Sequence, residues 1–325
     1  MHFSIHTATL ALCLFVIGGL AACQATSPVK AEAKATHEAA AEIIELREAG
    51  LIANYYPAAR DKAGPGLLML GGSEGGLNPA VSREAQALRD QGISVLQLSF
   101  YRAEGQPQNL EMVPLETFDR GLDWLKARGE VDADRIGIYG TSKGAEAALI
   151  TATRHTEIAA IVAMVPSSVS WQGINWAFDG RPADASWSLG GAPYPALPYG
   201  AFDYETGLYS LYANGLKAVE EHPEAVIAIE KTQAPVLLIC GSADALWPSC
   251  PMSETIAARA KERNGPDVTI LSYPDAGHGA GGMPAGKLDP ATAGEALDWG
   301  GTRRTNYAAN RESWPQVVSF LTDTL

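Results

Sequence analysis

The sequence predicts an α/β fold in which helices cover both faces of a mostly parallel sheet. Short apolar runs rich in β-forming residues recur along the chain, and segments with apolar residues at helical spacing separate them. Strands that alternate with amphipathic helices are typical of parallel sheets. The apolar runs are continuous rather than alternating, which indicates strands buried on both faces. The length of 325 residues is compatible with one large domain or two small ones.

The predicted elements follow one another in a regular order. Residues 43–56 alternate apolar and polar side chains around Gly50, which favours a leading antiparallel hairpin. Asn78 and Pro79 are the expected cap and first residue of the next helix. The other predicted strands are 66–70, 93–98, 136–139, 159–165, 234–240 and 268–273; the other predicted helices lie near 115–125, after 144 and near 307–321.

The segment 166–233 interrupts this order. It has little strand–helix patterning, and ten of its 68 residues are aromatic, about 15% against 8% for the whole chain. Loops of this length inside a domain are usually functional. We therefore predict a cap insertion within a domain spanning 43–325, whose aromatic residues line a pocket or pack the cap onto the core. These residues are Trp171, Trp176, Phe178, Trp187, Tyr194, Tyr199, Phe202, Tyr204, Tyr209 and Tyr212.

The N-terminus has the pattern of an export signal. Residues 1–23 contain no Lys, Arg, Asp or Glu, and the apolar run 9–20 is too short to span a bilayer as a helix. Its end, Leu-Ala-Ala-Cys23, resembles a bacterial lipoprotein signal, and an ordinary secretory signal is the alternative. We expect lipid on Cys23, a tether over 24–42, and an exported, periplasmic protein anchored in a membrane. Gln24 favours the outer membrane by its resemblance to sorting signals.

Composition excludes several partners. The net charge of −13 disfavours nucleic acid and anionic membrane surfaces. No cluster of His, Cys, Asp and Glu has metal-ligand spacing, so neither a metal nor a cofactor is implied.

Cys240 and Cys250 are ten residues apart and are candidates for a disulfide in an oxidising compartment, although Cys240 alone also fits a buried free thiol. Nothing in the sequence indicates an oligomeric state.

The most informative motif is the G-x-S-x-G at 140–144. A short apolar strand precedes it and an Ala/Leu-rich helix follows, so Ser142 is placed on a sharp strand-to-helix turn. This resembles the nucleophile elbow of the α/β-hydrolases, in which small residues flank the serine because the turn presses them against neighbouring backbone. The amide of Lys143 then points from the helix N-terminus at a developing oxyanion. The sequence predicts Ser142 as a nucleophile.

A serine nucleophile requires a base and an orienting acid. Of the downstream histidines, His155 follows the elbow too closely and His222 lies among charged residues, whereas His278 follows the last predicted strand. Asp244 follows the preceding strand, and Asp275 is its competitor. Since the carboxyl ends of parallel strands share one edge of a sheet, His278 is the predicted base and Asp244 the predicted acid.

A second oxyanion donor is expected from the glycine-rich loop 71–76. Its backbone is free to approach a substrate carbonyl, and we predict the amide of Glu74 as the donor, with Ser73 next. The side chains of Glu74 and Lys143 would flank the nucleophile. We expect them to pair with each other or to be solvated rather than to act in catalysis.

Four motifs in order, GGSEGG, YGTSKGAE, CGSADALWPS and YPDAGHG, resemble the C-terminal domain of the acyl-CoA thioesterase/bile acid-CoA:amino acid N-acyltransferase family, which is related to dienelactone hydrolases. The resemblance implies an α/β-hydrolase fold and a triad of Ser142, Asp244 and His278. A serine rather than a cysteine nucleophile favours water as the acceptor. An exported protein would meet little coenzyme A, so the resemblance supports hydrolysis more firmly than that leaving group.

These observations predict an exported hydrolase of acyl esters or thioesters that needs no cofactor and acts on a small molecule. A lipid-anchored binding protein that keeps the fold without catalysis is one alternative. An amidase or peptidase is another. Both alternatives can be tested with a serine-directed probe and with matched ester and anilide substrates.

Overall fold

The computed structural model describes residues 42–48 and 50–325. The predicted signal, the lipidation site Cys23 and all but the last residue of the predicted tether lie outside these residues. In the described part of the chain, no helix combines the length and apolar character needed to cross a membrane.

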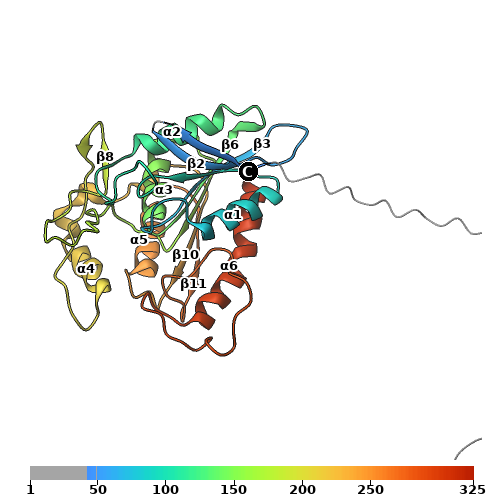
Figure 1. The fold of residues 1–325 in the computed structure, drawn as a ribbon. Helices are drawn as coiled ribbons and strands as arrows, with labels where there is room; N and C mark the ends of the chain where they lie inside the picture. The colour runs from blue at the N-terminus through green and yellow to red at the C-terminus, as the bar shows by residue number, and fades with distance from the viewer. Residues whose placement is uncertain (1–41, 49) are drawn as a thin grey trace, which may run out of the picture. The chain divides into compact units, whose positions relative to one another are not determined.

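One large sheet runs through the described domain (Figure 1). Its strands are β1 (Ile44–Glu48), β2 (Leu51–Tyr56), β3 (Gly64–Leu70), β4 (Ser94–Ser99), β6 (Val131–Thr141), β7 (Ala160–Met164), β10 (Val236–Gly241) and β11 (Val268–Tyr273). Their order is β1-β2-β4-β3-β6-β7-β10-β11. β2 pairs antiparallel with β1 and with β4, and all other neighbours are parallel. The predicted fold class is confirmed.

The central strands are buried along their whole length. Every residue of β3, β4, β7 and β10 is buried, as continuous apolar runs predict for parallel strands covered on both faces. The edge strand β11 is only partly buried, and in β1 Leu46 is the one buried residue. The core therefore lies on the two faces of the inner strands.

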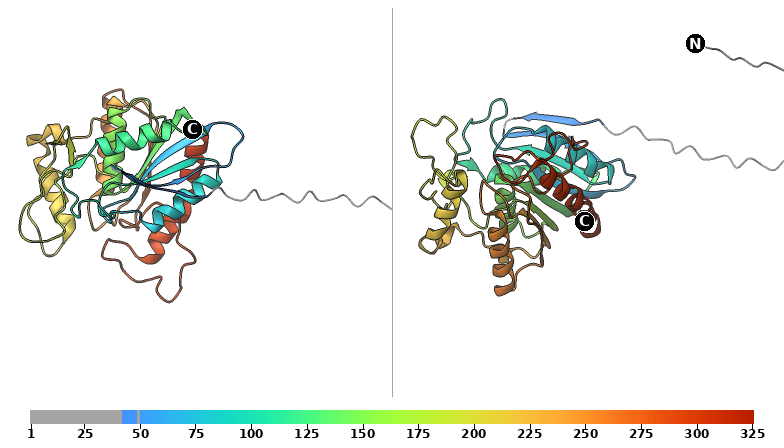
Figure 2. Two further views of the ribbon diagram at one scale, coloured as in Figure 1. Left: turned by 45° about the horizontal axis from the view of Figure 1, so that its top comes forward. Right: turned by 90° about the horizontal axis from the view of Figure 1, so that it is seen from below.

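Five helices cover the sheet, and the two views of Figure 2 show them on opposite faces. α2, α3 and α5 pack in one apolar cluster with Leu68 and Ile138 of the sheet. α1 and α6 pack in a second cluster with Leu67 and Met69. Alternate residues of β3 thus serve the two clusters. The helices are α1 (Pro79–Asp90), α2 (Glu116–Lys126), α3 (Lys143–Arg154), α5 (Ser249–Glu262) and α6 (Arg303–Thr324).

Residues 166–233, called the insertion below, are largely irregular. Trp171, Tyr199 and Tyr212 of the insertion pack against one another and, with Trp247, belong to a separate apolar cluster. Trp187 instead joins the main core on the α2 and α3 side. The regular elements of the insertion are β8 (Trp187–Leu189), β9 (Ala192–Pro193), α4 (Leu208–Gly215) and the 3₁₀ turns η1 (Leu216–Glu221), η2 (Pro223–Ala225) and η3 (Ile229–Lys231). Strand β8 pairs with β9 and with β5 (Val113–Pro114), which precedes the insertion.

Candidate active site

The serine of the G-x-S-x-G motif lies at a strained turn between β6 and α3. Ser142 has φ 55° and ψ −120°, a left-handed conformation that a residue with a side chain rarely adopts. The flanking glycines explain how the turn is possible. A Cβ on Gly140 would lie 2.2 Å from the carbonyl oxygen of Gly144, and a Cβ on Gly144 would lie 2.0 Å from that of Gly71. The spacing of the motif is therefore dictated by backbone contacts.

Three segments bring Ser142, His278 and Asp244 together at the carboxyl edge of the sheet. Oγ of Ser142 lies 2.8 Å from Nε2 of His278, and Nδ1 of the same ring lies 2.9 Å from Oδ2 of Asp244. The tautomer with its proton on Nδ1 satisfies both contacts, with the imidazole donating to the carboxylate and accepting from the hydroxyl. His278 follows β11 and Asp244 follows β10, as the sequence predicts. The geometry joins the three residues in one hydrogen-bonded chain.

The carboxylate of Asp244 is held by further donors. Its Oδ1 accepts hydrogen bonds from the amides of Leu246 at 2.9 Å and Trp247 at 3.2 Å. Ser249 donates to Oδ2 at 2.7 Å, so this oxygen accepts hydrogen bonds from both Ser249 and the imidazole of His278. The competitor Asp275 has an exposed side chain that makes no hydrogen bond with His278. The orientation of the carboxylate is thus fixed by the loop that carries it.

The other two downstream histidines lie in unrelated surroundings. His155 caps the far end of α3, where its ring nitrogens face Asp119 at 2.8 Å and Glu157 at 3.2 Å. His222 faces Glu224 at 3.6 Å. Neither contacts Ser142 or lines the cavity in front of it. Of the three downstream histidines, the structure therefore brings only His278, the one selected from the sequence, to Ser142.

Backbone amides beside Ser142 and in the loop after β3 have no acceptor within the described residues. The amide of Lys143 is the first of α3, and helix geometry leaves the first amides of a helix without internal partners. Glu74 lies in the loop after β3, whose Gly72 is so close that its added Cβ would lie 3.2 Å from Cβ of Ser142. Within the described residues, neither amide has a hydrogen-bond acceptor. Ser73, the second choice from the sequence, lies in the same loop, and its amide likewise has no hydrogen-bond acceptor in the part of the chain that the structure describes.

The side chains of Glu74 and Lys143 do not pair with each other. Glu74 is exposed, in line with the solvated alternative, whereas Lys143 is buried and pairs elsewhere. Nζ of Lys143 lies 2.6 Å from Oε2 of Glu146 in a fully buried ion pair. Oε1 of Glu74 instead accepts from the amide of Gly72 at 3.0 Å and from Nδ2 of Asn78 at 2.9 Å. The reason is local, since residues three apart lie on the same face of a helix and Lys143 finds Glu146 within its own turn.

A cavity of about 680 Å³ opens in front of Ser142 and His278. Of the ten aromatic residues of the insertion, Trp176 is the one that lines this cavity. The others divide into three that pack within the insertion (Trp171, Tyr199 and Tyr212), two that pack against the main core (Trp187 and Tyr194), three that are exposed (Phe178, Phe202 and Tyr204) and Tyr209, which is partly buried. The wall also contains Trp299, which sequence reasoning missed because it lies in an irregular segment after the histidine loop. The other apolar lining residues include Val81, Met164 and Leu246, and the polar ones include Glu74, Asn78, Glu84 and Arg102.

Glu84 was also missed from the sequence. It is buried on α1, where Oε2 accepts a hydrogen bond from Oη of Tyr139 at 2.6 Å and Oε1 accepts from the amide of Met283 at 2.9 Å. Burial raises the pKa of the Glu84 carboxyl, and these hydrogen bonds oppose the shift. A signal was present in the sequence, because Glu84 occupies the same helical face as Val81 and Leu88.

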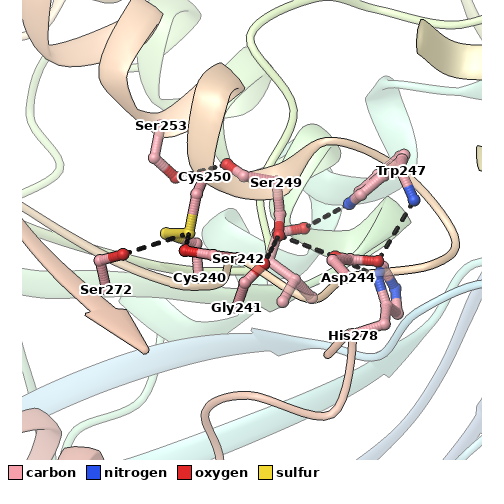
Figure 3. Close-up of a disulfide and its surroundings, with 11 residues drawn as sticks. Cys240, Gly241, Ser242, Asp244, Trp247, Ser249, Cys250, Ser253, Ser272 and His278 are labelled. Atoms are coloured by element: carbon pink, nitrogen blue, oxygen red, sulfur yellow. Dashed lines mark hydrogen bonds and ion pairs between the residues drawn. A yellow bond between two sulfur atoms is a disulfide. The ribbon is translucent and has the colours of Figure 1, made fainter. Parts of the chain in front are cut away.

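Cys240 and Cys250 form a disulfide, shown in Figure 3 beside the loop of Asp244. It joins the end of β10 to the first turn of α5. Cys250 directly follows Ser249, the residue that donates to Asp244. The crosslink therefore closes the loop that presents the acid. No group of three or more His, Cys, Asp and Glu side chains in the described residues is arranged to hold a metal ion.

The fold and the site geometry define the class of protein. A serine on a strand-to-helix elbow, facing a histidine beyond the last strand of a mostly parallel sheet, is the arrangement of the α/β-hydrolases. The dienelactone hydrolase-like phosphotriesterase P91 from metagenomic libraries matches 84% of this chain and 92% of its own, with a TM-score of 0.52 at 15% identity. The α/β hydrolase GrgF from Penicillium sp. sh18 matches over 87% of this chain and 98% of its own, with a TM-score of 0.51 at 16% identity. These likenesses concern the fold.

The family follows from sequence comparison. The chain belongs to the family described as BAAT / Acyl-CoA thioester hydrolase C terminal, whose model matches residues 113–325. Human acyl-coenzyme A thioesterase 6 is 28% identical over 275 residues, and mouse bile acid-CoA:amino acid N-acyltransferase is 27% identical over 271 residues. Each alignment covers 79% of this chain but 59% of the relative, so the chain spans less than two-thirds of their length. The family resemblance predicted from the motifs is confirmed.

Proposed function

We propose that the protein is a serine hydrolase that cleaves acyl esters or thioesters, with Ser142 as its nucleophile. One observation carries the proposal, the unbroken hydrogen-bonded chain from Ser142 through His278 to Asp244. A serine hydroxyl is a weak nucleophile at neutral pH and needs such a base and orienting acid. Membership of a thioester hydrolase family supports the same chemistry.

In the first half-reaction, Oγ of Ser142 attacks the substrate carbonyl carbon while Nε2 of His278 takes the hydroxyl proton. The tetrahedral intermediate then collapses, the bond to the leaving oxygen or sulfur breaks, and His278 returns the proton to that atom. In the second half-reaction, water attacks the acyl-enzyme, and its proton passes through His278 to Oγ as the free acid leaves. Asp244 holds the imidazole and stabilises its protonated form in both halves.

The negative charge that develops on the carbonyl oxygen needs donors that are already in place. The amide of Lys143 is the first, since it begins α3 beside Ser142 and lacks an acceptor within the described residues. The loop after β3 supplies the second. We propose the amide of Glu74, with that of Ser73 as the alternative in the same loop.

The cavity wall supports an apolar acyl substrate. Met164, Trp176 and Trp299 give it extensive apolar surface, which suits an apolar acyl group. The relatives are named for coenzyme A thioesters. We therefore propose coenzyme A as one leaving group. It must be compared with simple esters, because the chain is acidic overall and a polyanionic ligand needs local positive charge.

A panel of substrates tests this proposal. p-Nitrophenyl esters of increasing chain length are compared with acyl-coenzyme A and with the same acyl groups on N-acetylcysteamine, which lacks phosphates. We expect turnover of apolar acyl esters and thioesters, and matched anilides report amidase activity. If the folded protein shows no turnover and no adduct with a fluorophosphonate, the non-catalytic binding protein becomes the better account.

We also propose that the protein is exported and held at a membrane by lipid on Cys23. The sequence at the N-terminus motivates this, and the disulfide between Cys240 and Cys250 supports it because such bonds persist mainly in oxidising compartments. Cys23→Ala tests the proposal. We expect the wild-type protein to incorporate labelled palmitate and to fractionate with membranes, and the variant to do neither; a soluble wild-type protein without label would contradict it.

A further inference from the structure

The side chain of Lys143 takes part in a buried network behind the proposed oxyanion donor. Its ion pair with Glu146 is almost completely shielded, with side chains 1% and 0% exposed. Burial lowers the pKa of Lys143 and raises the pKa of Glu146, and the opposite charge of each partner opposes these shifts. Neither side chain lines the cavity. Because burying two charges costs free energy even when they are paired, the pair is unexplained by stability alone.

Glu146 connects this pair to the insertion. Its Oε1 accepts hydrogen bonds from the backbone amide of Trp171 at 2.9 Å and from Nε1 of Trp187 at 2.7 Å. Nζ of Lys143 lies 5.6 Å from the ring centroid of Trp187, within the range of a cation–π contact. Both carboxylate oxygens are therefore used, one by the helix and one by the insertion.

The same insertion is also linked to the base, through Trp247, which lies outside the insertion. Trp171 packs edge-on against Tyr212 at 5.0 Å between ring centroids, and Tyr212 packs against Trp247 at 5.3 Å. Trp247 in turn lies 5.6 Å from the ring of His278. Trp171 is thus linked to the nucleophile helix through Glu146 and to His278 through two aromatic rings.

We propose that the Lys143–Glu146 pair is a positioning device that holds the first turn of α3 against the insertion. Ser142 occupies a strained conformation, which persists only where its surroundings over-determine it. The pair supplies that constraint on the helix side and fixes the direction of the Lys143 amide. The inference rests on the proposed function, since the pair itself touches no substrate and performs no chemical step.

The test is the double variant Lys143→Met with Glu146→Gln. It removes both charges, nearly conserves volume and leaves the backbone amide in place. Replacing a buried ion pair by neutral groups of similar size is often close to neutral for stability, so we expect little change in Tm. We expect kcat for a p-nitrophenyl ester to fall about 10- to 100-fold with KM changed less than about 3-fold, because a displacement of about 1 Å has costs of this size.

A matched control lies at the other end of the same helix. Arg154 makes two hydrogen bonds with Asp119, at 2.9 and 2.8 Å. The double variant Asp119→Asn with Arg154→Gln neutralises that pair, and we expect kcat to change less than about 2-fold because the pair lies far along α3 from the elbow.

The outcomes separate positioning from folding. Wild-type kcat in a folded Lys143→Met, Glu146→Gln variant would overturn the inference. Should that variant fail to fold, Trp187→Phe removes one donor to Glu146 and keeps a ring in the core; we expect a kcat reduction of about 3- to 10-fold at unchanged KM, and no reduction would overturn the inference equally. Absence of turnover and of serine-probe labelling in the wild-type protein is a different result, which contradicts the proposed function instead.

Discussion

Oγ of Ser249 lies 2.7 Å from Oδ2 of Asp244, the oxygen that also faces Nδ1 of His278 at 2.9 Å. Ser249 is the first residue of α5 and is fully buried. Its hydroxyl and the imidazole thus bind the same carboxylate oxygen, and Figure 3 draws the three residues together. The direction in which Asp244 presents its charge therefore depends on the start of a helix outside the cavity.

We predict that Ser249→Ala lowers kcat about 10-fold without a comparable change in KM. A hydrogen bond to a charged group contributes about 1.5–3 kcal/mol, and a loss of about 1.4 kcal/mol in the transition state corresponds to tenfold in rate. Ser253→Ala is the control, because Ser253 is buried one turn later and donates to the carbonyl oxygen of Ser249 rather than to the acid. Steady-state kinetics on one ester decides. Equal effects of the two variants would show that the loss is only structural.

The disulfide closes a short loop around the acid. We predict that Cys240→Ala with Cys250→Ala lowers the free energy of unfolding by about 2–3 kcal/mol, the loss of loop-closure entropy expected for a crosslink of this span. Activity measured well below the lower Tm should fall as well, because Asp244 lies inside the loop. Thermal unfolding with and without a reductant provides the measurement. A variant as stable and as active as the wild type would contradict the assigned role.

Glu84 gives the stability a pH dependence of known sign. Burial raises its folded-state pKa above the ordinary value of 4.5, so the unfolded chain releases this proton at lower pH than the folded chain. Its contribution to stability is complete below that value and declines as pH rises through the folded-state pKa. We predict that the stability of the wild type relative to Glu84→Gln decreases as pH rises above the ordinary carboxyl pKa of 4.5, measured by urea unfolding across a pH series. A relative stability that rises with pH would reverse the assignment.

The elbow tolerates no added carbon at Gly144. A Cβ there would lie 2.0 Å from the carbonyl oxygen of Gly71. Because that oxygen belongs to the backbone, no rotation of a side chain can relieve the clash. We predict that Gly144→Ala destabilises the protein by on the order of 3 kcal/mol and reduces ester turnover strongly. Gly129→Ala is the control, since nothing lies within 4 Å of its added Cβ. Circular dichroism melts and ester kinetics on both variants test the claim.

Much of the sheet was predictable because parallel strands buried on both faces have continuous apolar sequences. β3, β4, β7 and β10 follow this rule, and each was predicted within a few residues of its ends. α5 was missed. Its buried side is largely small or polar, with Ser249, Cys250 and Ser253 beside Met252 and Ile256, so no apolar stripe marks the helix.

The three central site residues were predictable because each has a strong local signal and a fixed place in the order of strands. Ser142 has a glycine-flanked turn, and His278 and Asp244 follow consecutive strands of the predicted sheet. The network behind them was not. Glu146 looks like an ordinary residue in the first turn of a helix, and its contacts with Trp171 and Trp187 join residues 25 and 41 positions apart that no periodicity relates.

Labelling of Ser142 tests the central claim most directly. The folded wild-type protein and the Ser142→Ala variant are incubated with a fluorophosphonate, the adduct is mapped by peptide mass, and ester turnover is measured on the same samples. We predict one adduct on the peptide containing Ser142, none in the variant, and a fall in kcat on the order of 10⁵- to 10⁶-fold. An adduct on another residue, or turnover that survives the substitution, would contradict the account.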